Sequence, residues 1–473
     1  MPPSPTLWWV RRDLRLTDNA ALCAALARQG PVIPVFLYDE VVQTLGAAPM
    51  WRLGLGLEVF AKTLAQVGSR LILRRGRALE ALRDLISETG AQAVYWNRLY
   101  DPAALQRDKA VKAALKNDGI AAHSTPGHVL FEPWTVETGG AGYYRVYSPF
   151  RRAVWDRTVD VPARAPARLS SPDTWPYSEA LGDWHLARAM NRGATVVCDH
   201  VRVGETAAKA RLDQFVAHHM HRYHADRDRL DLNATSGLSE SLTYGEISPR
   251  ICYWAVADKI QSGDKGAEKF VQELLWREFA YHLMYHTPHI VHKNWRQEWD
   301  AFPWNTDADR AEVQAWKRGM TGMPIIDAAM REMYVTGHMH NRARMLVASY
   351  LTKHLMTHWK IGLNWFADCL VDWDPAANAL GWQWTAGSGP DAAPYFRVFN
   401  PDLQAEKFDP DHIYRRRFLA ESYPDPSDTA LSYFAAIPRN WSINAHGPYP
   451  HTPIVSATEG RNRALKAYEE RDF

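Results

Sequence analysis

The chain has 473 residues, of which 46% are hydrophobic and 23% charged, so its composition is that of a folded globular protein and excludes a disordered one. This length exceeds what one hydrophobic core usually supports, and two or three structural units are expected. The formal net charge of +2 excludes a globally basic nucleic-acid binder, so any such surface must be a local patch.

The four cysteines are widely spaced and form no C-x-x-C pair. Their spacing predicts neither a disulfide framework nor a zinc or iron–sulfur site. The first residues lack the basic start and apolar core of a signal peptide, and no apolar run approaches membrane-spanning length. We therefore expect a soluble cytoplasmic protein with no membrane contact.

From Thr6 to about residue 130, short apolar runs alternate with helical patterns at the spacing of βα units. This alternation predicts an α/β N-terminal domain, residues 1–130, with a parallel, Rossmann-like sheet. Asp18 and Asn19 lie where the first helix should begin, but no G-x-G-x-x-G follows the first strand, so a standard dinucleotide site is not expected. The expected strands are residues 7–10, 32–38, 70–73 and 93–96.

Residues 131–204 have a less regular pattern, and four prolines between residues 162 and 176 exclude a continuous helix there. We interpret this segment as an interdomain connector. From residue 205 the pattern is mainly helical, as in residues 268–279, where apolar residues recur at steps of three and four. This predicts a large all-α C-terminal domain, residues 205–473.

Three uncommon motifs follow one another in the helical region. They are E-L-L-W-R-E-F at residues 273–279, G-H-M-H-N-R-A-R-M at residues 337–345, and L-V-D-W-D-P-A-A-N-A-L-G-W-Q-W at residues 370–384. Together they resemble the DNA photolyase/cryptochrome family, and three separated motifs in order are more specific than one short pattern. The resemblance covers nearly the whole chain and implies an α/β domain that can carry an antenna pigment and a helical domain that holds FAD.

Two sets of side chains in these motifs have i, i+3, i+4 spacing and share a helix face. An amphipathic helix with an ion pair, or a core methionine, would explain either set alone. The resemblance implies instead a pocket for a flipped-out pyrimidine dimer, in which a partly desolvated Glu273 stays protonated and donates to a carbonyl group. The implied pocket residues are Glu273, Trp276, Asn341, Met345 and Trp384, with Arg277 in the surrounding site.

Asn341 and Asn378 separate the branches of the family. The resemblance places a histidine at position 341 in the branch that repairs the (6-4) photoproduct, so Asn341 favours cyclobutane dimers. Asn378 is expected to face flavin N5, where its amide oxygen can accept a hydrogen bond. Plant cryptochromes usually have aspartate there and the insect type cysteine, so Asn378 favours repair over signalling.

The resemblance also implies the FAD ligands. Arg344 is expected to pair with Asp372 near the flavin, because an unpaired buried charge would be costly, and Asp374 to accept a hydrogen bond from the isoalloxazine edge. The string T-S-G-L-S is a weak signal alone, although hydroxyl and backbone N–H groups suit phosphate oxygens. The remaining implied cofactor residues are Tyr223, Thr235, Ser236, Gly237, Leu238, Ser239, Phe270 and Arg277.

Three tryptophans, Trp382, Trp359 and Trp304, match the family chain through which an electron reaches photoexcited oxidised flavin. Most of the 20 tryptophans are expected to be structural. The third assignment rests on the F-P-W setting of Trp304, and the nearby alternatives are Trp295, Trp299 and Trp316.

Residues 331–360 contain five basic residues against one acid, which indicates either a solvated helix face or a DNA surface. Contacts to phosphates are expected to be salt-sensitive and independent of sequence. His282 and His286 have i, i+4 spacing, but the metalloprotease glutamate is missing between them, so no metal site is predicted. The candidate DNA contacts are Arg227, Arg342, Arg397 and Lys407.

The resemblance implies light-driven repair of cyclobutane pyrimidine dimers by a monomer that binds dimer-containing DNA and is associated with the nucleoid when bound. The alternatives are a cryptochrome-type blue-light photoreceptor, which the absence of a long C-terminal tail disfavours, and a nucleic-acid-binding flavoprotein without catalysis. Residues 97–104 lack the Asn-Glu pair that binds folate in one bacterial subgroup. The resemblance to the bacterial photolyases closest to plant cryptochromes implies a differently placed methenyltetrahydrofolate antenna, ahead of a deazaflavin.

Overall fold

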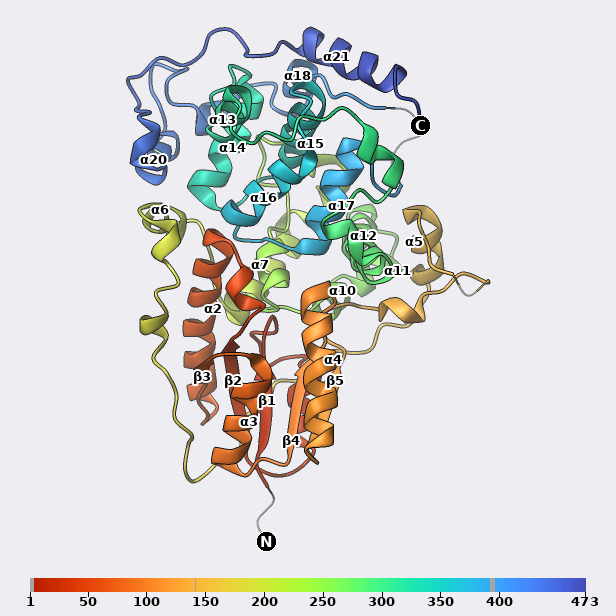
Figure 1. Cartoon of the computed structure of the whole chain (residues 1–473), viewed down its shortest axis with the longest axis vertical. Helices are drawn as coiled ribbons and strands as arrows, with labels where there is room; N and C mark the ends of the chain where they lie inside the picture. Colours follow the sequence, from red (N-terminus) through yellow and green to blue (C-terminus); the bar gives the residue numbers. More distant parts are fainter. Residues whose placement is uncertain (1–3, 141, 392–395) are drawn as a thin grey trace.

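A five-stranded parallel sheet forms the core of the N-terminal domain. The computed structural model describes residues 4–140, 142–391 and 396–473. The strands have the order β3-β2-β1-β4-β5, and helices cover both faces of the sheet (Figure 1). Their bounds are β1 (Thr6–Val10), β2 (Val32–Tyr38), β3 (Ile72–Arg75), β4 (Ala93–Asn97) and β5 (Ala121–Thr125).

The α/β prediction is confirmed, and the four expected strands are present with bounds shifted by up to two residues. The fifth strand was missed because A-A-H-S-T is short and has no apolar run. Asn19 caps the first helix by accepting a hydrogen bond from the Leu22 N–H at 3.1 Å. The helices here are α1 (Ala20–Leu26), α2 (Ala47–Gln66), α3 (Ala78–Thr89) and α4 (Pro102–Asn117).

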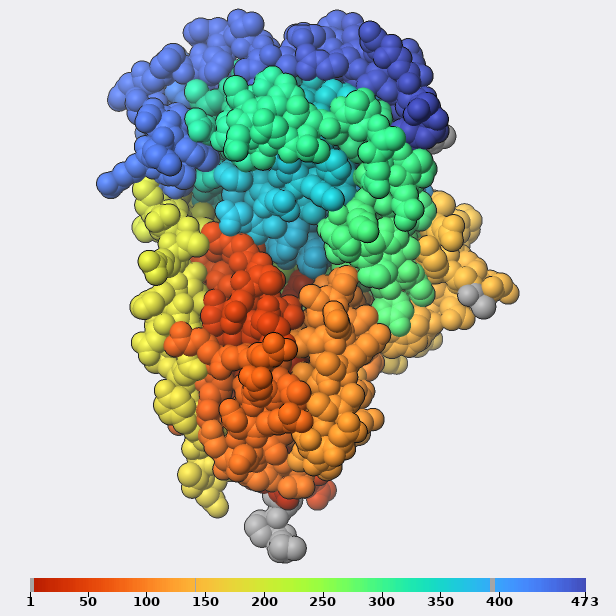
Figure 2. All heavy atoms as spheres, viewed as in Figure 1, coloured from red at the N-terminus to blue at the C-terminus, as the bar shows by residue number. Residues whose placement is uncertain are grey.

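The segment of residues 131–204 packs on both domains. It contains α5 (Tyr147–Trp155) beside the helical domain and α6 (Gly193–Cys198) on the opposite flank (Figure 1). Residues 162–176 contain no helix, as the prolines predict. Figure 2 shows the later part of the segment, in yellow, lying along the side of the α/β domain. The segment is therefore part of the packed structure.

The remaining chain is helical, as predicted. Its longest helix, α12 (Lys265–His286), begins where the Asp264 carboxylate accepts hydrogen bonds from two backbone N–H groups. The other helices are α7 (Glu205–His218), α8 (Tyr223–Asp226), α9 (Ser239–Thr243), α10 (Pro249–Trp254), α11 (Ala257–Gln261), α13 (Ala311–Lys317), α14 (Pro324–Thr336), α15 (Asn341–Ser349), α16 (Trp359–Cys369), α17 (Pro375–Ala386), α18 (Pro401–Phe408), α19 (Ile413–Phe418), α20 (Asp428–Ala436) and α21 (Ala457–Glu469).

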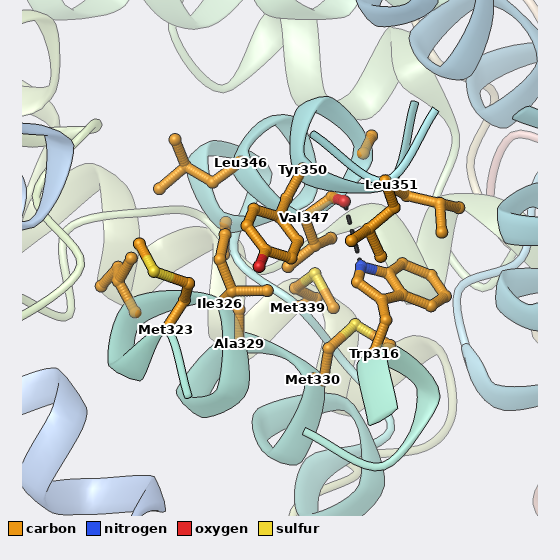
Figure 3. Packing of buried hydrophobic residues seen from close by; sticks show 14 of the residues in the cluster. Trp316, Met323, Ile326, Ala329, Met330, Met339, Leu346, Val347, Tyr350 and Leu351 are labelled. Carbon is orange, nitrogen blue, oxygen red and sulfur yellow. Dashed lines mark hydrogen bonds between the residues drawn. The ribbon is translucent and has the colours of Figure 1, made fainter. Parts of the chain in front are cut away.

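An apolar core between α14 and α15 fixes the position of α15. Trp316, Met330 and Val347 belong to this core, and the Trp316 indole N–H donates to the Val347 backbone oxygen at 3.1 Å (Figure 3). Because one face of α15 is buried in this way, its other face carries Asn341 and Met345 toward the surface. Within the described residues, none of the helices is long and apolar enough to cross a membrane.

Candidate functional site

Helices α12, α15 and α17 bring the three sequence motifs together. α17 packs against both α12 and α15. The first motif lies on α12, the second includes α15, and the third leads into α17 and continues along it. Residues that are more than 100 positions apart in the chain therefore contribute to one site.

Glu273 on α12 is the acidic partner of two cations. Its carboxylate accepts hydrogen bonds from the Arg227 guanidinium at 2.5 and 3.1 Å, and the Lys269 ammonium lies at 3.0 Å. These two ion-pair contacts of Glu273 were not expected from the sequence. The sequence could not show this, because Arg227 precedes Glu273 by 46 residues. Arg227, expected on the DNA surface, is instead the ion-pair partner of Glu273.

The two predicted aromatic walls are both partly accessible. Trp276 on α12 stacks on Tyr147, with ring centroids 3.6 Å apart and planes 9° apart. Trp384 on α17 donates its indole N–H to the Asp391 backbone oxygen at 3.1 Å. Neither Tyr147 nor Asp391 was a candidate, since Tyr147 lies in the segment interpreted as a connector. The only sequence signal for Tyr147 was its position as an aromatic residue at the start of a short amphipathic helix.

The N-terminus of α15 lies near the Arg227–Glu273 ion pair. His340 caps α15 by accepting the Arg342 N–H, and it lies close to Arg227, the partner of Glu273. Burial lowers the pKa of His340 to about 4, so the imidazole is neutral at physiological pH. Asn341 is exposed and Met345 half-buried. Both side chains are thus accessible on α15.

Arg344 on α15 forms the predicted ion pair with Asp372. The two guanidinium–carboxylate distances are 2.7 and 2.9 Å. Burial acts to raise the pKa of Asp372, but Arg344, His338 and a hydrogen bond from Ser239 outweigh it and hold the pKa below its usual value. Asp372 is therefore a buried carboxylate that joins α15 and α9.

Asp374 caps α17 and has several partners. One carboxylate oxygen accepts the Ala377 N–H at 2.9 Å, and the other accepts the Tyr281 hydroxyl and the Arg12 guanidinium, the latter at 3.2 Å. Asn378 donates its amide nitrogen to the Asp374 backbone oxygen at 2.9 Å. A carboxylate offers about four acceptor positions, so little capacity remains on Asp374 for a ligand.

A buried hydrogen-bond network joins this cap to the N-terminal domain. The Tyr281 hydroxyl lies 2.7 Å from His128 Nε2, and Arg277 donates to the His128 backbone oxygen at 2.8 Å. Burial, followed by Arg277 and other arginines, holds the pKa of His128 well below its usual value. Arg277, expected in the FAD site, is thus bound at the junction of the domains. The sequence analysis missed Tyr281, His128 and Arg12.

The T-S-G-L-S segment forms a turn that leads into α9. Gly237 has φ +60°, a conformation that is strained for residues with a Cβ, and a Cβ there would also displace Arg211 Nη1, which lies 2.2 Å away. Leu238 is buried, whereas Thr235, Ser236 and Ser239 are at least partly accessible. Tyr223 is buried and packs edge-on against Phe270 of α12. Accessible hydroxyl groups beside a helix start suit an anionic ligand.

The three predicted electron-transfer tryptophans are all buried. Trp359 donates to Asn294 Oδ1 at 2.7 Å and Trp304 donates to the Thr352 backbone oxygen at 3.0 Å. The His358 ring contacts both, with centroids 5.4 Å from Trp359 and 5.2 Å from Trp304. Trp382 packs directly on α16. Its ring lies so close to Gly362 of this helix that a Cβ there would be 2.0 Å from it. The alternative Trp316 contacts Trp382 instead, at 6.3 Å.

Two of the predicted DNA contacts share an aromatic ring. The Arg342 guanidinium lies 4.6 Å and the Lys407 ammonium 5.3 Å from the centroid of Phe408. Arg342 also pairs with Asp228 at 2.6 Å. Arg397 is exposed, and its backbone oxygen accepts the buried Lys353 ammonium at 3.3 Å. α15 and α18 thus present adjacent cations.

The chain is similar to known proteins over nearly its whole length. Residues 6–167 match the family model described as DNA photolyase, and residues 270–470 match the one described as the FAD binding domain of DNA photolyase. A deoxyribodipyrimidine photo-lyase of Agrobacterium fabrum is 44% identical, over 98% of both chains. The crystal structure of a bacterial class III photolyase from Agrobacterium tumefaciens matches with TM-score 0.90 and 43% identity, covering 99% of this chain and 98% of that one. Cryptochrome-2 of Arabidopsis thaliana is 33% identical over 88% of this chain and 70% of its own.

Proposed function

Because this chain belongs to the DNA photolyase family, we propose that it is a deoxyribodipyrimidine photo-lyase, which uses light to repair cyclobutane pyrimidine dimers in DNA. The observation that carries the proposal is the meeting of the three motifs on α12, α15 and α17. The same fold and family also hold the cryptochrome relative, so signalling is the second candidate function.

The site has the donor and acceptor set that FAD requires. Hydroxyl groups of Thr235, Ser236 and Ser239 suit the pyrophosphate, while the Arg344–Asp372 pair and the Asn378 amide suit the flavin. When bound and reduced, FAD supplies the electron that passes to the dimer under blue light. The protein positions donor and lesion.

The lesion pocket is formed by Glu273, Trp276, Asn341, Met345 and Trp384. A dimer leaves the duplex at lower cost than intact bases because its pairing and stacking are already weakened. The aromatic walls replace the lost stacking. Arg227 and Lys269 hold the Glu273 carboxylate, so lesion binding must share or replace one of these contacts. The electron that splits the dimer returns afterwards, and no net redox change occurs.

DNA approaches the pocket along the cations of α15 and α18. Arg342 and Lys407 lie together at Phe408, and Arg397 precedes α18. Contacts of this kind bind phosphates of any sequence, so affinity should fall steeply with salt. Trp304, Trp359 and Trp382 provide the electron path for reducing the flavin. We propose that the protein is a cytoplasmic monomer and that it lies at the nucleoid when it is bound to DNA.

The α/β domain of residues 1–130 is proposed to carry an antenna chromophore, methenyltetrahydrofolate rather than a deazaflavin. The segment of residues 131–204 joins this domain to the helical domain of residues 205–473. Extraction of the purified protein, followed by absorption and fluorescence spectra of the released pigment, distinguishes the two chromophores. A deazaflavin spectrum would replace the folate assignment.

The test of the proposed function is an anaerobic repair assay. Photoreduced protein and an oligonucleotide with one dimer are exposed to blue light, with a dark sample and a Glu273→Ala variant beside them. Repair that needs light and is weakened about 10- to 100-fold in the variant supports the proposal, since a hydrogen bond to a charged group contributes about 1.5–3 kcal/mol. Flavin photoreduction without repair would instead support the photoreceptor function.

A further inference from the structure

Trp276, one wall of the lesion pocket, has a second aromatic ring packed flat against it. Tyr147 begins α5 and is only 7% exposed. Its ring lies parallel to the indole, with centroids 3.6 Å apart. The Tyr147 hydroxyl donates to the Gln272 backbone oxygen at 2.8 Å, which fixes the ring to α12 one turn before Trp276. Tyr147 thus covers one face of Trp276, whose side chain stays partly accessible.

Phe279 holds the same pair of rings from the side. It meets both Tyr147 and Trp276 edge-on, each at 5.9 Å. Offset and edge-on aromatic contacts contribute beyond their buried area. The indole plane is therefore held by contacts on two sides before any DNA is bound.

The start of α5 also lies beside the second wall. Asp391, whose backbone oxygen accepts the Trp384 indole N–H, has its carboxyl group close to the backbone N–H of Tyr147. Burial raises the pKa of Asp391, and this N–H partly offsets the rise. Tyr147 therefore stacks directly on the wall from α12 and is linked through Asp391 to the wall from α17.

We propose that Tyr147 is a positioning residue of the lesion pocket, which holds the Trp276 plane in the orientation that receives a flipped-out dimer. This inference rests on the proposed function. An indole without its stacked partner has more rotamer freedom, and ordering it on binding costs affinity. Undamaged DNA binds through phosphates and does not enter the pocket, so Tyr147 contributes to selectivity and not to general DNA binding.

The test compares dark binding of two oligonucleotides, one with a dimer and one undamaged, by four forms of the FAD-bound protein. These are the wild type, Tyr147→Leu, Tyr147→Phe and a control, Tyr144→Leu. Tyr144 lies in the same segment, but its ring contacts Phe150 and His282, not Trp276. FAD content and thermal unfolding report folding, and Tyr147→Met replaces Tyr147→Leu if the latter does not fold.

We expect Tyr147→Leu to bind the dimer about tenfold more weakly, while undamaged DNA binds as before. Tyr147→Phe keeps the ring and retains most of the selectivity, and Tyr144→Leu behaves as wild type.

Equal weakening for damaged and undamaged DNA, or no weakening in Tyr147→Leu, would overturn the positioning role. So would loss of selectivity in Tyr147→Phe that equals the loss in Tyr147→Leu, because the ring would then not be the cause. If the wild type itself fails to prefer the dimer or to repair it in light, the proposed function fails. The two failures are therefore distinguished by the wild-type sample alone.

Discussion

Charged residues pair with one another and are buried at one edge of the parallel sheet in the α/β domain, whereas the ion pairs of the helical site stay partly accessible. At the carboxyl ends of β1 and β2, where parallel sheets commonly bind ligands, Arg11 pairs with Asp108 at 2.9 Å and Arg107 pairs with Asp39 at 2.8 Å. Both guanidinium groups also lie over Trp9. These side chains are at most 10% exposed.

The ion pairs of the helical site are more accessible. The Arg344 side chain is 21% exposed and Glu273 26% exposed, although each has a partner as close as those in the sheet domain. A cluster of charged residues therefore indicates a ligand-binding site only when part of the cluster stays accessible. In the α/β domain the same residue types satisfy one another and contribute to packing.

Of the variants that test this difference between the two domains, Arg344→Ala should have the largest effect on stability and on FAD content. The Asp372 side chain, 1% exposed, would lose its cation, and breaking a buried pair costs about 3–5 kcal/mol. We expect that loss in the free energy of unfolding, together with loss of FAD, measured by denaturant titration and by flavin absorbance per protein. Adding Asp372→Asn should recover stability but not FAD. Full FAD content in Arg344→Ala would contradict the assignment.

Arg107→Ala makes a matched break in the α/β domain. It removes the cation from Asp39, whose side chain is fully buried, and a similar loss of about 3–5 kcal/mol is expected. Because the hydrogen bonds of Arg107 go to Asp39 and Asp108 and not to the three motifs, the folded protein should keep its FAD and its repair rate. The same two measurements apply, with the light-driven repair assay added. Loss of FAD without loss of stability would contradict the view that this cluster contributes to packing and not to ligand binding.

Glu278→Gln tests a buried group at the junction. Burial raises the pKa of Glu278 to about 7, and its Oε2 accepts the Leu130 N–H at 2.7 Å. The folded state therefore holds the proton more tightly than the unfolded state, so wild-type stability falls as pH rises from about 4.5 to 7. The variant has no such loss. We expect it to be more stable than wild type by about 1–3 kcal/mol at pH 8 and equal near pH 5, measured by unfolding at both pH values.

Two i, i+4 pairs should have the smallest effects. Lys62–Glu58 lies on α2 of the sheet domain, and Lys269–Glu273 lies on α12 of the helical domain. Pairs of this kind contribute little to stability, so Lys62→Ala and Lys269→Ala should each change the free energy of unfolding by less than about 0.5 kcal/mol. Thermal unfolding at low and high salt checks this. A loss above about 1 kcal/mol at Lys269 alone would contradict the small contribution expected of this pair.

Local signals in the sequence predicted most of the fold. The apolar runs gave four of the five strands, and the cap at Asn19 and the periodicity of α12 were read correctly. β5 was missed because its edge position places polar residues in a strand with no apolar run. The candidate site came from motif wording, and of its expected pairings Arg344–Asp372 is present.

The sequence alone determined which residue types are available: an α/β unit, a helical unit, and three motifs whose side chains share helix faces. Only the tertiary structure decided which of these groups meet, because pairing depends on elements far apart in the chain. Arg227 reaches Glu273 across 46 positions and Tyr281 reaches Asp374 across 93. Tyr147 reaches Trp276 from a segment with no recognisable motif. Helix periodicity determines which side chains share one face of a helix. The packing of that face against another element determines which partners those side chains have.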